Sequence, residues 1–183
     1  MRRPPFLIAA GGVFVITTAL PASAATSGRT EMTAIDSAGP TTTTFTVTNG
    51  ALTITTPDSV NLGSGAPGTT IGPTALGTVT ANDNRASASA SWAATVSSTD
   101  FTSGSQTIPA PDATYTTGTV AKTGTITITS VPTLTLTGAA QTVVSGTAGI
   151  GDNSATWDPT IAIAVPVSAV AGLYSGTITH SVS

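Results

Sequence analysis

Hydrophobic and polar residues alternate with a period of two along much of the chain from residue 45 onward. The clearest apolar positions are Phe45 with Val47, Leu52 with Ile54, Ile126 with Ile128, Leu134 with Leu136, and Ile161 with Ile163 and Val165. This period is typical of β-strands that bury one face. The intervening Thr residues suit the outward positions, because a β-branched side chain fits a pleated sheet while its hydroxyl group faces water. No segment after residue 24 has a helical period, so the sequence predicts an all-β fold.

Two further strands place distinctive side chains on an apolar face. In residues 87–96, Trp92 lies on the same face as Ala94 and Val96, and serines occupy much of the opposite face. In residues 174–183, Tyr174 and His180 lie on the apolar face of the last strand. The period of two therefore predicts that these rings point into the sandwich.

Turn-forming residues separate the strands. They occur at Asn49-Gly50, Pro57-Asp58, residues 63–68, Gly72-Pro73, residues 82–84, Gly138, residues 151–153 and Gly172. Short strands with this spacing predict a single domain, residues 45–183, with an antiparallel immunoglobulin-like or Greek-key β-sandwich of about 8–10 strands. Strand order does not follow from periodicity.

The beginning of the chain has the features of a signal peptide, residues 1–24. Basic Arg2 and Arg3 precede an apolar stretch, residues 6–20, and Ala22-Ser23-Ala24 forms a small-residue cleavage site. The apolar stretch is shorter than the roughly 20 residues of a membrane-spanning helix, so no integral membrane segment is expected after cleavage. Residues 25–44 are small and polar and predict a flexible leader. We therefore expect a secreted protein.

Charge excludes several classes of partner. Only 7% of residues are charged, against an average of about 25%. After signal cleavage, Arg29, Arg85 and Lys122 remain as the only basic residues, and eight acidic residues oppose them. Nucleic acid is excluded because phosphate binding requires clustered Lys and Arg, and anionic membrane surfaces are disfavoured for the same reason.

The composition also argues against a metal or other cofactor. One histidine and no cysteine cannot supply a usual zinc site. Calcium ligands are available in residues 82–84, or in Asp152, Asn153 and Asp158, but neither set has the spacing of a calcium loop. Asx-turns explain these residues equally well. We predict no metal and no cofactor.

Catalytic residues are equally sparse. His180 is the single candidate for a general base, and its place on an apolar face predicts a packed histidine. Gly63, Gly65 and Gly68 match a phosphate-binding pattern, but no helix follows them, so they predict a loop. We predict no catalytic residue and a non-enzymatic protein. A secreted hydrolase using His180 is the least favoured alternative.

Ligand binding by aromatic stacking is a further possibility for a secreted domain. Trp157 stands beside Asp158-Pro159 at the entrance to a strand, which makes it the tryptophan most expected to be exposed to a sugar. Trp92 and Tyr174 fall on apolar faces, where packing is the simpler interpretation.

Two short motifs resemble those of the WxL domain of Gram-positive cell-surface proteins. That family has D-x-R before W-x-L and a distal Y-x-x-x-L-T-W-x-L. Here Asp83-Asn84-Arg85 precedes Trp92-Ala93-Ala94, and residues 174–182 read Y-S-G-T-I-T-H-S-V. The resemblance spans about residues 62–183. Ala94 replaces the leucine of the first motif, and His180 replaces the tryptophan of the second.

The resemblance implies a function at the cell surface. It implies non-covalent attachment to peptidoglycan, assembly with other exported surface proteins, and Asp83, Arg85, Trp92 and Tyr174 as the matched site positions. The sequence thus predicts a cell-wall-associated, non-catalytic domain that binds peptidoglycan or surface proteins. The alternative is a self-assembling subunit of a surface polymer, because a Thr-rich last strand offers an edge for strand addition.

Overall fold

A computed structural model describes residues 41–183. The predicted signal peptide, residues 1–24, and residues 25–40 of the predicted leader lie outside this range. The folded unit is Phe45–Ser183, and the remainder of this section concerns that unit.

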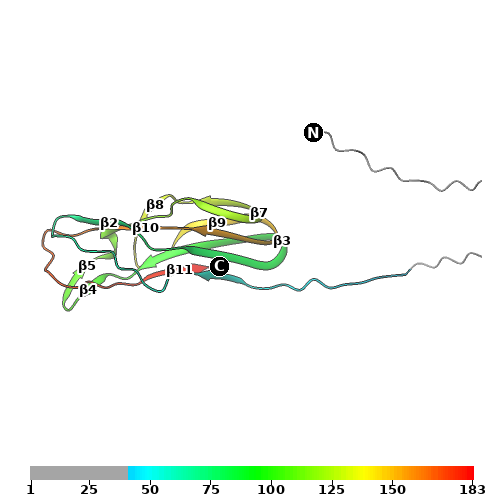
Figure 1. The fold of residues 1–183 in the computed structure, drawn as a ribbon, viewed down its shortest axis with the longest axis horizontal. Coiled ribbons are helices and arrows are strands. Elements are labelled where there is room, and N and C mark those ends of the chain that lie inside the picture. The colour runs from blue at the N-terminus through cyan, green and yellow to red at the C-terminus, as the bar shows by residue number, and fades with distance from the viewer. Residues whose placement is uncertain (1–40) are drawn as a thin grey trace, which may run out of the picture. The chain divides into compact units, whose positions relative to one another are not determined.

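Strands make up nearly all of the regular structure (Figure 1), which confirms the all-β prediction. The elements are β1 (Leu52–Thr55), β2 (Thr70–Ala75), β3 (Val79–Ser98), β4 (Phe101–Ser103), β5 (Gln106–Ile108), a short 3-10 helix η1 (Ala110–Asp112), β6 (Ala113–Thr116), β7 (Val120–Ser130), β8 (Thr133–Thr135), β9 (Gln141–Trp157), β10 (Thr160–Ala164) and β11 (Ile178–Val182). The small β4–β5 hairpin adds strands to the 8–10 that the sequence predicts. Within residues 41–183, no helix is long and apolar enough to span a membrane.

Antiparallel pairing organises the strands into two principal sheets, as predicted. The first has the order β1-β3-β9-β7, and β11 also pairs with β3. The second has the order β2-β10-β6-β8. The strands β4 and β5 form a hairpin with each other, and Thr102 of β4 also forms an isolated antiparallel bridge with Ser175.

The long strands β3 and β9 fold back on themselves. Asp83 of β3 pairs with Asn153 of β9, and Trp92 of β3 pairs with Gly146. A straight strand would separate Asp83 from Trp92 by about 30 Å. However, the indole Nε1 of Trp92 lies 3.1 Å from the Oδ1 of Asn153. The first sheet must therefore bend sharply between these positions, so that its two halves face each other.

Left-handed backbone conformations mark the bend in the three neighbouring strands β3, β9 and β7. They occur at Ala86 in β3 (φ 50°), Gly124 in β7 (φ 74°) and Gly151 in β9 (φ 67°). The pairing register shifts between Asp83 and Ser87 and again between Thr123 and Thr125. Such irregularities sharpen the local twist of a strand, and glycine adopts a positive φ without steric cost.

Several predicted turns therefore lie inside strands. Residues 82–84 belong to β3 and residues 151–153 to β9, because pairing resumes on both sides of the bend and the chain turns without leaving the sheet. Gly72-Pro73 belongs to β2, which pairs only along its β10 side. A proline lacks a backbone N–H and is tolerated on such an edge.

The first strand begins later in the chain than the alternation at Phe45 and Val47 predicts. Residues 45–50, which include Phe45 and Val47, are exposed and form no strand, and pairing with β3 begins at Leu52. The alternation is present in the sequence, but no described strand pairs with this segment.

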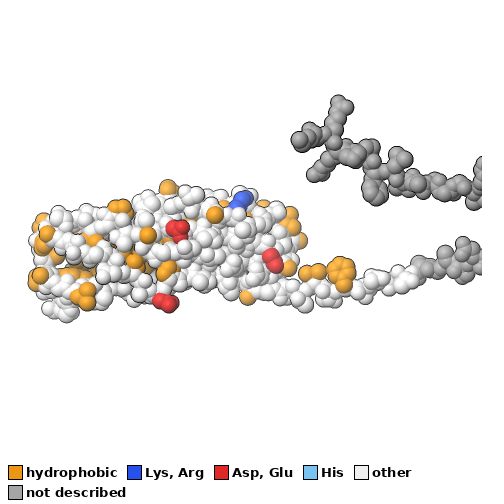
Figure 2. Space-filling model, in the orientation of Figure 1, with side chains coloured by type: hydrophobic (Ala, Val, Ile, Leu, Met, Phe, Trp, Pro, Cys, Tyr) orange, Lys and Arg blue, Asp and Glu red, His pale blue; other side chains and the backbone are white. Residues whose placement is uncertain are grey.

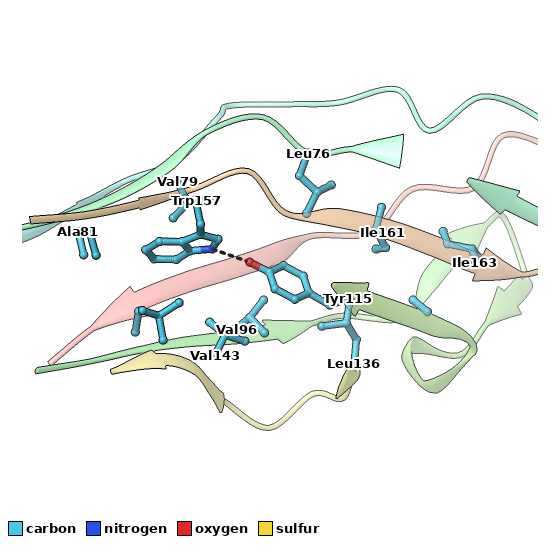
Figure 3. Close-up of a cluster of buried hydrophobic side chains, with 14 of the residues drawn as sticks. Leu76, Val79, Ala81, Val96, Tyr115, Leu136, Val143, Trp157, Ile161 and Ile163 are labelled. Atoms are coloured by element: carbon cyan, nitrogen blue, oxygen red, sulfur yellow. Dashed lines mark hydrogen bonds between the residues drawn. The ribbon is translucent and has the colours of Figure 1, made fainter. Parts of the chain in front are cut away.

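The core contains the apolar faces that the period of two predicts. Figure 3 shows Trp157, Tyr115, Val79, Val96 and Leu136 packed together. Trp92, Ala94 and Val96 are buried as expected, whereas Ala88 is exposed close to the bend. Fully burying a large aliphatic side chain contributes about 1.5–3 kcal/mol, so this core is the main source of stability in a domain without disulfides.

Substitution of Gly146 tests how tightly Trp92 and Ile126 pack over β9. A Cβ atom there would lie 2.5 Å from Ile126 Cδ1 and 2.6 Å from Trp92 Cε2. We expect Gly146→Ala to lower the free energy of unfolding by about 1–3 kcal/mol through overpacking, measured by urea denaturation. The matched control is Gly138→Ala, where a Cβ meets no atom within 4 Å. Equal effects of the two substitutions would contradict the packed arrangement.

Candidate functional site

The D-x-R motif forms an ion pair at the bend, with a buried carboxylate and a partly exposed guanidinium group. The Asp83 carboxylate is inaccessible to solvent and accepts hydrogen bonds from Arg85 Nε at 2.8 Å and Arg85 Nη2 at 3.0 Å. Nη2 also donates to the carbonyl oxygen of Ser91 at 2.8 Å. Arg85 therefore ties the segment before the bend to the segment after it.

Asn153 extends this pair to Trp92. Its amide Nδ2 donates to Asp83 Oδ2 at 3.4 Å, and its Oδ1 accepts from Trp92 Nε1. Asp83, Arg85 and Trp92, which the family resemblance marks, thus lie in one network with Asn153 as the link. Sequence reasoning missed Asn153 in this role, because its cross-strand position depends on the register of β3 and β9.

Electrostatics favour the ionised form of Asp83. The hydrogen bonds from Arg85 lower the pKa of this carboxyl group, and burial opposes the shift to a smaller extent. All of its polar neighbours come from the same network, so the group is occupied by intramolecular contacts. The arrangement stabilises the bend and offers no free ligand to a metal ion or substrate.

Trp157 is not exposed, which contradicts its selection as a stacking platform. Its side chain is 1% exposed and donates from Nε1 to the hydroxyl oxygen of Tyr115 at 3.1 Å (Figure 3). Trp157 ends β9, and it packs between the two halves of the sandwich because the following Asp158-Pro159 segment continues into β10 instead of leaving the domain.

His180 completes a hydrogen-bonded chain with these two residues. The Tyr115 hydroxyl lies 3.0 Å from His180 Nε2. Because that hydroxyl already accepts from Trp157, its own proton is available to a neutral His180 Nε2. Burial lowers the pKa of His180 to about 4 and raises the pKa of Tyr115 to about 12. Within residues 41–183, no carboxylate or Ser or Thr hydroxyl is hydrogen-bonded to His180. This geometry gives no support to the hydrolase alternative.

A large apolar groove lies at the end of the domain that contains β2, β4 and β5. Its volume is about 900 Å³. Ile71 from β2, Ile163 from β10, Phe101 from β4 and Ile108 from β5 form its apolar interior. Figure 2 shows hydrophobic side chains reaching the surface at this end, on the left of the view.

Two irregular segments form the rim of the groove. Residues 57–62 contribute Val60, and residues 170–173 contribute Val170 and Leu173, all of them exposed; Leu173 is 89% exposed. Tyr174 also lines the groove and donates its hydroxyl proton to the Val170 carbonyl oxygen at 2.9 Å. It precedes β11, which begins at Ile178, so its predicted place within the last strand is wrong.

The groove also has unpaired backbone along its walls. Among the described residues, the backbone groups of residues 57–62 and 170–173 form no hydrogen bond with other backbone groups, and β2 is paired along one edge only. Of these groups, the carbonyl oxygens of Leu62 and Val170 accept hydrogen bonds from the Thr74 and Tyr174 side chains. Asp58 is the only charged side chain that lines the groove. Such a site suits an uncharged, extended, apolar segment of protein. The sequence did not reveal it, because its walls come from five separate parts of the chain.

The Asp and Asn residues considered as calcium ligands lie in separate local contacts. Within residues 41–183, no group of three or more His, Cys, Asp or Glu side chains is placed to hold a metal ion. Asp83 and Asn153 are engaged at the bend, while Asp158 accepts a hydrogen bond from Thr78 at 2.6 Å.

Comparison of the chain with models of protein families, with curated proteins and with solved structures finds no match. The resemblance to WxL domains therefore stays a prediction, and a functional argument depends on the geometry described above.

Replacing His180 tests the chain of Trp157, Tyr115 and His180. The unfolded chain takes up a proton near pH 6.5, whereas folded His180 does so only near pH 4. The free energy of unfolding should therefore fall as the pH decreases through this window. We expect His180→Gln, which keeps a hydrogen-bond acceptor but does not titrate, to flatten this decrease in thermal denaturation.

Titration of Asp83 does not account for the decrease in stability between these pH values. Its pKa lies below 3.8, so the stability that it contributes is lost only as the pH falls further. Parallel pH profiles for the His180→Gln variant and the unmodified protein between pH 6.5 and 4 would show that His180 is not the buried neutral group described here.

Proposed function

We propose that this chain is a non-catalytic structural subunit that self-assembles by adding a strand from another copy to its sandwich. The observation that supports the proposal is the apolar groove of about 900 Å³ with unpaired backbone along its walls. Unpaired backbone and alternating apolar pockets are the two features that recognition by strand addition uses. The signal peptide predicted at residues 1–24 would place this assembly outside the cell.

Exposed apolar side chains favour association over a solitary domain. Val60, Val170 and Leu173 cluster on the groove rim, although single exposed apolar residues need no explanation. Contiguous apolar surface beside a cavity is typical of an interaction site. Because Asp58 is the only charged side chain in the lining, the association should depend little on salt.

Peptidoglycan binding stays a prediction from the family resemblance. Stacking on a sugar requires an exposed aromatic ring. Trp92, Trp157 and Tyr115 are buried and Tyr174 is partly buried, whereas Phe45 is 88% exposed but stands alone outside any strand. No described feature of the domain favours this function over self-assembly.

Sedimentation velocity of the exported chain over a range of concentrations tests the proposal. We expect the weight-average sedimentation coefficient to rise with concentration and to stay high in strong salt. Leu173→Asp should weaken association by about tenfold or more, because a charge in an apolar contact costs at least 1.4 kcal/mol.

The matched control is Ile150→Asp, since Ile150 is 60% exposed and does not line the groove. This variant should associate as the unmodified chain does. A monomer at every concentration, or equal weakening by both substitutions, would overturn the proposed function.

A further inference from the structure

One segment of this chain exposes apolar side chains without a partner. Phe45 is 88% exposed and Val47 is 75% exposed, and they alternate with Thr44, Thr46 and Thr48. None of residues 45–50 belongs to a strand. The segment thus has the pattern of a half-buried strand but makes no contact that would bury its apolar face.

The groove and this segment are chemically matched. Residues 41–56 contain no charged side chain, and the groove lining contains only Asp58. The segment offers two alternate apolar side chains, Phe45 and Val47, and the backbone groups of residues 45–49 form no backbone hydrogen bond. The groove offers an apolar interior between walls whose backbone groups lack backbone partners. The apolar side chains of the segment can be buried there, and its backbone can form hydrogen bonds with the walls.

The segment is too short to fill the groove of its own copy. Gly50 is held at the bend, because its N–H donates to the Asn84 carbonyl oxygen at 2.6 Å. The groove begins at Thr56, beyond the opposite end of β1, which is about 20 Å further along an extended chain. A segment that reversed at Gly50 would bring Phe45 only about 17 Å in that direction.

We propose that residues 45–49 of one copy insert as an added strand into the groove of a second copy. This inference rests on the proposed function and identifies the residues that assembly uses. Because the segment leaves one end of β1 and the groove opens beyond the other end, the contact is head-to-tail. A contact of this kind leaves a free groove and a free segment at the two ends, so it repeats into an open chain of subunits.

Disulfide trapping tests the contact directly, since the chain contains no cysteine. One variant has Val47→Cys and a second has Leu173→Cys. The two are mixed and oxidised briefly. We expect the yield of the disulfide-linked mixed dimer to be about tenfold or more above the yield from the control pair. The reason is that the docked contact holds both thiols at an effective millimolar concentration.

The control pair is Val47→Cys with Ile150→Cys, which places an exposed thiol on the bend and away from the groove. A single chain with both Val47→Cys and Leu173→Cys should give a ladder of covalent multimers. Equal yields from the two pairs, or an intramolecular disulfide in the double variant, would overturn the inference.

A second variant separates this inference from the proposed function. Phe45→Asp with Val47→Asp changes only side chains that are exposed in the domain, so folding should be retained. We expect it to be monomeric, and to regain association when mixed with a chain whose segment is intact. If this variant still assembles while Leu173→Asp does not, the groove takes another strand and the donor assignment is wrong. If no form of the chain assembles, both proposals fail.

Discussion

The sharp bend of the first sheet is the constraint on which the rest of the domain depends. Asp83, Arg85, Asn153 and Trp92 join the two halves of β3 and β9 through a network of hydrogen bonds. Removing one member of such a buried network leaves its partners unsatisfied, which costs about 1–3 kcal/mol for each group. Because of the bend, two parts of one continuous sheet lie on opposite sides of Trp92.

The same constraint leaves the opposite end of the domain open. The doubled sheet closes around Trp92 and Ile126, whereas the inner faces of β2 and β10 meet the β4–β5 hairpin and irregular rim segments. These segments cover apolar side chains without completing a paired layer. The groove is therefore a consequence of how the strands are distributed, and it remains lined by an almost uncharged surface.

Low charge gives this surface its chemical character. A groove with one charged side chain cannot attract nucleic acid or select an ionic ligand, but it can accept an apolar strand with little desolvation cost. His180 is partly buried and hydrogen-bonded to Tyr115, and Asp83 is paired with Arg85, so each side chain has a partner within the domain. These features fit the structural assembly that we propose.

The sequence by itself determined the all-β class, the antiparallel sandwich and most inward faces, because a period of two in apolar side chains has one physical meaning in a half-buried strand. The motif resemblance in the sequence also marked Asp83, Arg85 and Trp92 as site positions. The tertiary structure alone decided that the turn-like residues 82–84 and 151–153 bend a continuous sheet, that Trp157 is buried, and that Phe45 and Val47 are unpaired. These outcomes depend on which strands become neighbours, and local preference cannot specify contacts between residues far apart in the chain.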